Sequence, residues 1–81
     1  MHIINVRFLN HIPLGQEVIP DNYMERGRNL SGSSCIDLLM YDAMFLKLTF
    51  NDGHRQYSQF VPWAQVASVM FDDAPTEKPQ A

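Results

Sequence analysis

Three histidines, His2, His11 and His54, are the side chains best suited to acid–base or metal chemistry at neutral pH. Imidazole has an ordinary pKa close to neutrality, and it is a frequent zinc ligand. Short zinc motifs bring further ligands at regular spacings. None of the three histidines has a second ligand at helical or turn spacing. The sequence therefore predicts no metal site and no cofactor.

Carboxylates and serines are the next candidates for chemistry. Asp37 and Asp42 fall near an expected strand and its end, positions typical of a solvated face and a turn cap. Ser31, Ser33 and Ser34 lie in a glycine-bearing stretch that lacks the Gly-Lys-Ser/Thr ending of a phosphate-binding loop, which favours a flexible linker. No nucleophile, base and orienting group form a recognisable arrangement. We therefore predict no catalytic residue and no enzymatic activity.

Charge and the single cysteine restrict the class of protein further. Of the formal charge of −3, −2 comes from Asp72, Asp73, Glu77 and Lys78. Lys78 is one of six basic residues, and the other five are too few to form a footprint on duplex nucleic acid. Cys35 excludes an internal disulfide and lies in a hydrophobic run, so we predict a small buried hydrophobe in a reducing compartment.

The remaining composition indicates neither a membrane span nor an export signal. There is no run of about 18 apolar residues, the length that a membrane span requires. Residues 2–7 do not form a basic segment followed by a long apolar one. We expect a cytoplasmic protein without membrane contact, for which nucleic acid is not the favoured partner, although a short single strand stays open.

Hydrophobic periodicity predicts five short strands. In residues 2–10, Ile4, Val6 and Phe8 alternate with the residues between them, the period-two pattern of a strand with one wet face. Residues 66–71 are expected to close the fold as the last strand. The three strands of a central meander are expected at residues 35–41, 44–50 and 55–61.

Turn-forming residues separate the later strands. Residues 51–54 read Asn-Asp-Gly-His, the strongest hairpin signal in the chain. Pro62 cannot donate to a sheet ladder, so residues 62–65 are predicted to form one helical turn. Leu48 is expected in the core, and Trp63 is favoured as a core or closing residue.

Residues 11–34 form an unusually long connection that is interrupted by prolines and glycines. Val18 and Ile19 are expected to form a short extended piece within it. Connections of this length are commonly functional or partly disordered, so we predict a partner surface here. Residues 72–81 are predicted to be a disordered acidic tail that follows a single β domain of residues 1–71.

Five short strands with one helical turn before the last resemble the small barrels of the Src-homology-three and Sm type. The resemblance covers residues 2–71 and implies a mainly β fold, either a small five-stranded antiparallel barrel or a strongly bent sheet. A barrel would also remove exposed sheet edges. The paired glycine and asparagine signatures of Sm proteins are absent, as are the acidic loop and aromatic ladder of proline-binding Src-homology modules. Neither family's ligand is therefore implied.

The meander, the segment Phe-Val-Pro-Trp-Ala-Gln-Val-Ala-Ser-Val at residues 60–69 and the charged tail also resemble short accessory proteins of bacteriophages. Together with the small size, the lack of a catalytic set and the interface-type residues of the long connection, this resemblance leads us to expect a non-enzymatic protein that occupies a surface of a larger partner. Its most concrete form is a phage-encoded inhibitor or modulator of a host defence complex, acting in the host cytoplasm.

Interface-type side chains occur in two regions. The long connection contains Tyr23, Met24, Arg26 and Arg28, of types enriched at protein interfaces. The arginines are expected to be exposed, whereas Tyr23 and Met24 could instead plug the open end of the barrel. The candidate partner-binding residues are Tyr23, Met24, Arg26, Arg28, Phe45, Arg55 and Tyr57.

The candidates on the meander depend on strand register. Arg55 and Tyr57 form an exposed stripe in one register, and Tyr57 is buried in the other. Phe45 shares a face with Lys47 and Thr49, and its exposure there would mark a contact patch.

Two alternative functions come from other classes. A small barrel could bind single-stranded RNA by stacking bases on aromatic side chains while arginines contact phosphates. The residues concerned would be Tyr23, Tyr57, Phe45, Arg26, Arg28 and Arg55. A self-assembling virion component could instead pair its strand edges or its Phe45 face with copies of the same chain.

Overall fold

The computed structural model describes residues 2–72, whose regular secondary structure is almost entirely short antiparallel strands. The elements are β1 (His2–Phe8), β2 (Pro13–Leu14), β3 (Glu17–Val18), β4 (Tyr23–Glu25), β5 (Ser34–Met40), β6 (Phe45–Asn51), β7 (Gln56–Pro62), the 3-10 turn η1 (Trp63–Gln65) and β8 (Val66–Asp72). The predicted mainly β class, the meander and the helical turn before the last strand are confirmed. Asp72 ends β8, and the rest of the predicted tail, residues 73–81, lies outside the described residues.

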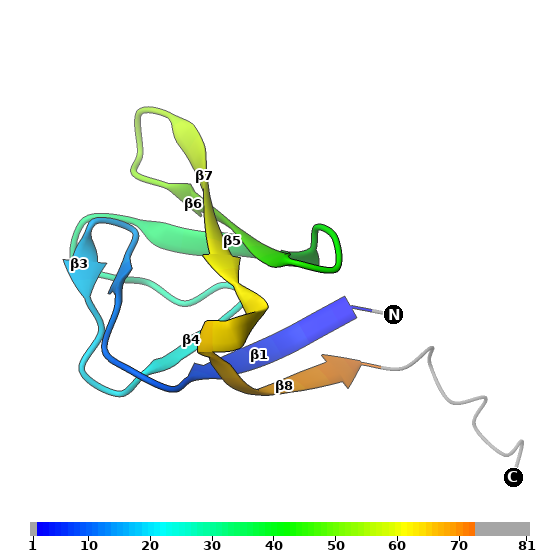
Figure 1. The fold of residues 1–81 in the computed structure, drawn as a ribbon. Helices are drawn as coiled ribbons and strands as arrows, with labels where there is room; N and C mark the ends of the chain where they lie inside the picture. Colours follow the sequence, from blue (N-terminus) through cyan, green and yellow to red (C-terminus); the bar gives the residue numbers. More distant parts are fainter. Residues whose placement is uncertain (1, 73–81) are drawn as a thin grey trace, which may run out of the picture.

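The strands form three sheets, so the predicted five-stranded barrel is wrong. The sheet orders are β4-β1-β8, β2-β3 and β5-β6-β7. Figure 1 shows β5-β6-β7 lying across β4-β1-β8, with the chain passing between them through η1. The physical reason is the use of β1: β8 pairs with one of its edges and β4, from the long connection, with the other. Because both edges of β1 are occupied, it cannot also pair with β5 and close a barrel.

The hydrophobic core lies between the two three-stranded sheets. Strand β1 contributes Ile3, Val6 and Phe8, which are almost completely buried, and Leu48 on β6 has no exposed surface. The core position of Leu48 is therefore confirmed. Ile4, by contrast, is 40% exposed. A register shift between Ile3 and Asn5 interrupts the alternation there, as a β-bulge does, and turns Ile4 outward.

The long connection is more ordered than its prolines and glycines suggested. It contains the two-residue strands β2 and β3 as well as β4, and it buries Leu14, Ile19 and Met24 in the core. The Gln59 side chain of β7 ties it to the meander: its Nε2 donates to the carbonyl of Pro13 at 2.6 Å, and its Oε1 accepts from the backbone N–H of Gly15 at 3.0 Å. These bonds hold the β2-β3 hairpin against β7.

Gly15 is a position where a side chain would conflict with the fold. Its φ is +59°, and an added Cβ would lie 3.0 Å from the Ser33 hydroxyl and 3.1 Å from the Phe50 ring. We expect Gly15→Ala to lower the free energy of unfolding by about 2 kcal/mol, from left-handed strain together with crowding in the core. The matched control is Gly27→Ala, where φ is +86° and no atom lies within 4 Å. It should cost only the backbone strain, about 1 kcal/mol. If urea titrations show the same loss of unfolding free energy for Gly15→Ala and Gly27→Ala, the added Cβ at residue 15 is not crowded by Ser33 and Phe50.

Two aspartates cap the turns of the meander. Asp52 Oδ1 accepts the backbone N–H groups of His54 and Arg55, each at 2.9 Å, and these bonds hold the pKa of the Asp52 carboxyl below its usual value. Asp42 Oδ1 accepts those of Met44 and Phe45 at 2.8 and 2.9 Å. The predicted hairpin at residues 51–54 and the turn-cap role of Asp42 are thus confirmed.

Candidate protein-interaction surface

The outer face of the β5-β6-β7 sheet presents a group of large apolar side chains to solvent. Its central row runs across the three strands from Leu39 through Lys47 to Phe60, which are Cα partners in the two ladders. Tyr41 and Phe45 lie in the next row on the same face, two residues along the chain from Leu39 and Lys47. We call these five residues the aromatic face. Neighbouring residues on the same strands alternate to the inner face, where Leu38, Leu46, Leu48 and Val61 are buried in the core, while Met40 near the end of β5 remains 54% exposed.

The rings of the aromatic face are packed against one another. The ring centroids of Tyr41 and Phe60 are 4.8 Å apart, and those of Phe45 and Phe60 are 6.3 Å apart, both in edge-to-face geometry. Tyr41 is nevertheless 56% exposed, Leu39 47% and Phe60 45%. A partner would therefore meet rings that are already positioned, so less side-chain freedom is lost on binding.

Lys47 provides the positive charge of this surface. It is half-buried between Leu39 and Phe60. Within residues 2–72, the ion pairs use Arg26, Arg28 and Arg55, and none uses Lys47. No ion pair within 4 Å reaches its ammonium group in this part of the chain, and Asp37, on the same face opposite Thr49, is paired with Arg26. An ammonium group set among apolar side chains in this way suits a partner that offers an acidic group within an apolar surface.

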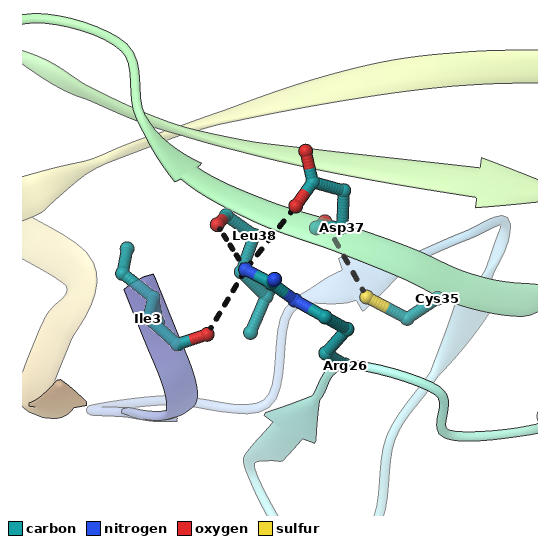
Figure 2. A network of polar contacts seen from close by, with 5 residues as sticks. All are labelled: Ile3, Arg26, Cys35, Asp37 and Leu38. Atoms are coloured by element: carbon teal, nitrogen blue, oxygen red, sulfur yellow. Dashed lines mark hydrogen bonds and ion pairs between the residues drawn. The ribbon is translucent and has the colours of Figure 1, made fainter. Parts of the chain in front are cut away.

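Arg26 links the two three-stranded sheets. Its guanidinium Nη2 donates to the carbonyl of Ile3 on β1 at 3.2 Å and to that of Leu38 on β5 at 3.1 Å, and it lies 3.2 Å from the Asp37 carboxylate (Figure 2). No backbone ladder joins β1 to β5, which belong to different sheets. The Arg26 guanidinium therefore bridges the two sheets by binding one carbonyl group from each. With 36% of its side chain exposed, Arg26 is anchored within the chain rather than free.

Cys35 lies beside this network and is fully buried, as predicted. Its Sγ lies 3.7 Å from the carbonyl oxygen of Asp37. Burial raises the pKa of the thiol to about 11. Since the thiolate is the reactive form of cysteine, the protonated Cys35 side chain packs as a small hydrophobe at neutral pH.

Arg28 also makes its contacts within the chain. Its Nη1 donates to the Asp21 carboxylate at 3.0 Å and to the carbonyl of Tyr23, and only 23% of the side chain is exposed. The hydrogen bond from Arg28 holds the pKa of the Asp21 carboxyl below its usual value. The Tyr23 ring lies close to two guanidinium groups, with its centroid 4.8 Å from Arg7 and 5.9 Å from Arg28. Two of the candidate binding residues, Tyr23 on β4 and Arg28 in the segment that follows it, therefore form a structural cluster.

The other four candidates occupy four different places. Met24 has no exposed surface and belongs to the core, which corrects its assignment to a partner surface. Tyr57 is half-buried and stacks on Phe50 with centroids 5.7 Å apart, so the register that buries it is realised. Arg55 is exposed at the adjoining turn. Phe45 lies on the aromatic face.

Sequence reasoning did not select Leu39, Tyr41 or Phe60. The signal that could have found Phe60 is the hairpin at residues 51–54, because once its centre is known the residue opposite Lys47 follows. Leu39 and Tyr41 require in addition the register between β5 and β6, which shifts between Cys35 and Asp37.

The serine-bearing loop uses the donors of Ser31, Gly32 and Ser34 internally, whereas the buried Ser33 hydroxyl has no hydrogen-bond partner among the described residues. The Ser31 hydroxyl and the Gly32 N–H donate to Glu17 Oε2 at 2.9 and 3.4 Å, and the Ser34 hydroxyl donates to Asn29 Oδ1 at 2.7 Å. A carboxylate thus occupies the donors that a phosphate would need. The loop is held to the β2-β3 hairpin by these bonds, in contrast to the expected flexible linker.

Comparison with protein families, curated proteins and solved structures found no match for this chain. The described residues contain no helix that is long and apolar enough to span a membrane. Residues 2–72 also contain no group of three His, Cys, Asp or Glu side chains that could hold a metal ion. The fold and the site define a small antiparallel β domain that carries a preformed aromatic surface.

Proposed function

We propose that this chain is a non-enzymatic interaction module that binds another protein through the aromatic face. The observation that carries the proposal is the exposure of Leu39, Tyr41 and Phe60 around Lys47 on the hydrogen-bonded β5-β6-β7 sheet. Exposed apolar groups of this kind mark contact surfaces, and aromatic anchors supply much of the binding energy at interfaces. The partner is expected to present apolar side chains around a carboxylate that pairs with Lys47.

The test is affinity capture from bacterial lysate, with and without nuclease. A protein that the tagged full chain captures is first identified, and the amount of this protein that each variant captures is then compared with the amount captured by the wild-type chain. We expect Leu39→Ser with Tyr41→Ser to weaken capture at least thirtyfold, equivalent to about 2 kcal/mol, because anchor side chains are lost. Lys47→Glu should weaken it through charge reversal. Met70→Ser, on the other three-stranded sheet and 56% exposed, is the matched control and should leave capture unchanged.

Each result bears on the proposal. Capture that survives the double substitution would remove the aromatic face as the binding site. Capture that disappears after nuclease treatment would favour the RNA alternative. We do not propose that alternative, because Arg26 and Arg28, which it needs for phosphates, are held by carboxylates and carbonyl groups of the chain.

Inhibition of a host defence complex by a phage-encoded protein is the narrower form of this proposal. It is supported by the small size of the domain and the weakly charged binding surface together with the sequence resemblance described above. It predicts that the captured partner loses activity when the wild-type chain is added and keeps it when the Leu39→Ser, Tyr41→Ser variant is added.

A further inference from the structure

The two three-stranded sheets have four edges, and three of them are obstructed. Strand β4 has only three residues and carries Glu25. Strand β8 departs twice from regular register with β1. Strand β5 has one register shift, carries Asp37, and has its Leu38 carbonyl occupied by Arg26. Short length, charge and bulges are the usual means by which proteins prevent edge-to-edge pairing.

The fourth edge, β7, has none of these obstructions along its centre. It spans seven uncharged residues, and its register with β6 continues without a shift from Asn51 opposite Gln56 to Phe45 opposite Pro62. Its sheet neighbour is β6 alone. Gln56, Ser58 and Phe60 are exposed. The backbone groups on the side of β7 that faces away from β6 therefore form a long, regular edge without a strand partner. The β2-β3 hairpin is held to β7 only through the inward side chain of Gln59 and not through this backbone edge.

The backbone groups available on this edge follow from the hydrogen-bond pattern. The N–H of Trp63 donates to the carbonyl of Met44 at 3.0 Å, which makes residues 63 and 44 a hydrogen-bonded pair. In an antiparallel ladder such pairs alternate with non-bonded ones, so Val61, Gln59 and Tyr57 direct their groups toward β6. Gln56, Ser58 and Phe60 then direct their N–H and carbonyl groups outward. Pro62 has no N–H and ends this outward series.

We propose that a second copy of this chain binds along β7, antiparallel, so that two β5-β6-β7 sheets join into one six-stranded sheet. This inference goes beyond the proposed function, because it uses the backbone of a sheet edge rather than the side chains of the aromatic face. The register that uses every outward residue places Ser58 opposite Ser58 of the partner subunit and Gln56 opposite Phe60 of the partner subunit. It allows up to about six backbone hydrogen bonds.

A second copy fits this edge because the pairing is self-complementary. A two-fold axis perpendicular to the sheet passes midway between Ser58 and Ser58 of the partner subunit. Both subunits then use the same edge, so the contact is isologous and the assembly stops at a dimer. No charge lies opposite a like charge, since β7 is uncharged. Shifting the register by two residues in one direction would place Pro62 opposite Gln56, where it cannot donate. Shifting it in the other direction would place Phe60 opposite His54, which lies outside β7. The axis also keeps the two aromatic faces on the same side of the joined sheet.

Sedimentation equilibrium of the full chain is the first test. We expect the mass to rise with concentration from 9.3 kDa to twice that value and no further. Amide hydrogen exchange should then show concentration-dependent protection at Gln56, Ser58 and Phe60, while Tyr57 and Gln59 are protected at all concentrations by β6. A mass of 9.3 kDa up to millimolar concentration, or a dimer without this alternating protection, would overturn the proposal.

Charge variants of Ser58 test the register. Ser58→Lys and Ser58→Glu should each weaken self-association at least tenfold, because like charges meet across the two-fold axis, and an equimolar mixture of the two should restore a dimer. Ser68→Lys, at an exposed position of β8, is the matched control and should dimerise like the wild type. If dimerisation survives Ser58→Lys but is lost in the Leu39→Ser, Tyr41→Ser variant, the two copies associate through their aromatic faces and the edge-pairing proposal is wrong. The exchange experiment on the wild type decides the question even if a Ser58 variant does not fold.

Discussion

Leu48→Ala is expected to lower the free energy of unfolding by about 2–5 kcal/mol, the range for removing a fully buried leucine. Leu48 lies at the centre of β6 with Leu38 and Gln59 as its Cα partners, and no part of it is exposed. The β strands on either side restrict collapse of the resulting cavity. Small domains are stable by about 5–15 kcal/mol, so this single truncation removes a large share of the total.

Urea titration followed by circular dichroism measures this loss. Leu39→Ala is the matched control: it deletes the same atoms from the adjacent strand, but Leu39 is 47% exposed on the opposite face of the sheet. We expect it to cost less than about 1 kcal/mol. Similar losses in the two variants would mean that the inward and outward faces of the β5-β6-β7 sheet are not those described.

Arg26→Met is expected to cost about 2–3 kcal/mol, the largest effect predicted for a polar side chain of this protein. The substitution keeps an unbranched stem but leaves the carbonyls of Ile3 and Leu38 without the donor that joins them. Hydrogen bonds to charged groups contribute about 1.5–3 kcal/mol, and partial exposure of Arg26 allows water to replace some of this. The same urea titrations measure the loss.

Two controls separate the carbonyl bridge from the ion pair. Asp37→Asn removes the carboxylate and should cost less than about 1 kcal/mol, because both side chains of this pair are partly solvated. Arg26→Lys retains the charge but not the planar fork, and its cost should be intermediate. If Asp37→Asn proved as damaging as Arg26→Met, the ion pair rather than the bridge between sheets would be the stabilising contact.

Local pattern predicted the strands because each strand carries its own signal. The alternation in β6 and the turn chemistry at residues 51–54 depend on neighbours in the sequence, and both gave elements close to those observed. The single helical turn at η1 followed from Pro62 for the same reason. At Ile4 local pattern was insufficient, because the register shift against β8 reverses the expected facing of that side chain.

The candidate site was less accessible to sequence reasoning. Phe45 was selected because it shares a strand face with Lys47, which is a local relation. Phe60 and Tyr41 join it only through the pairing of three strands. Residue type alone pointed to Arg26, Arg28 and Met24, but the carbonyls, carboxylate and core that surround these side chains come from distant segments.

The sequence by itself determined the mainly β class, the meander with its capped turns, and the identity of core residues such as Leu48 and Cys35. These depend on side-chain alternation and turn preference, which act over a few residues. Only the tertiary structure decided that β4 takes the second edge of β1, that Arg26 spans the resulting gap, and that β7 is left as the unobstructed edge. Those outcomes depend on which segments, distant in the sequence, pair with the same strand edge. Side-chain alternation within one strand carries no information about that choice.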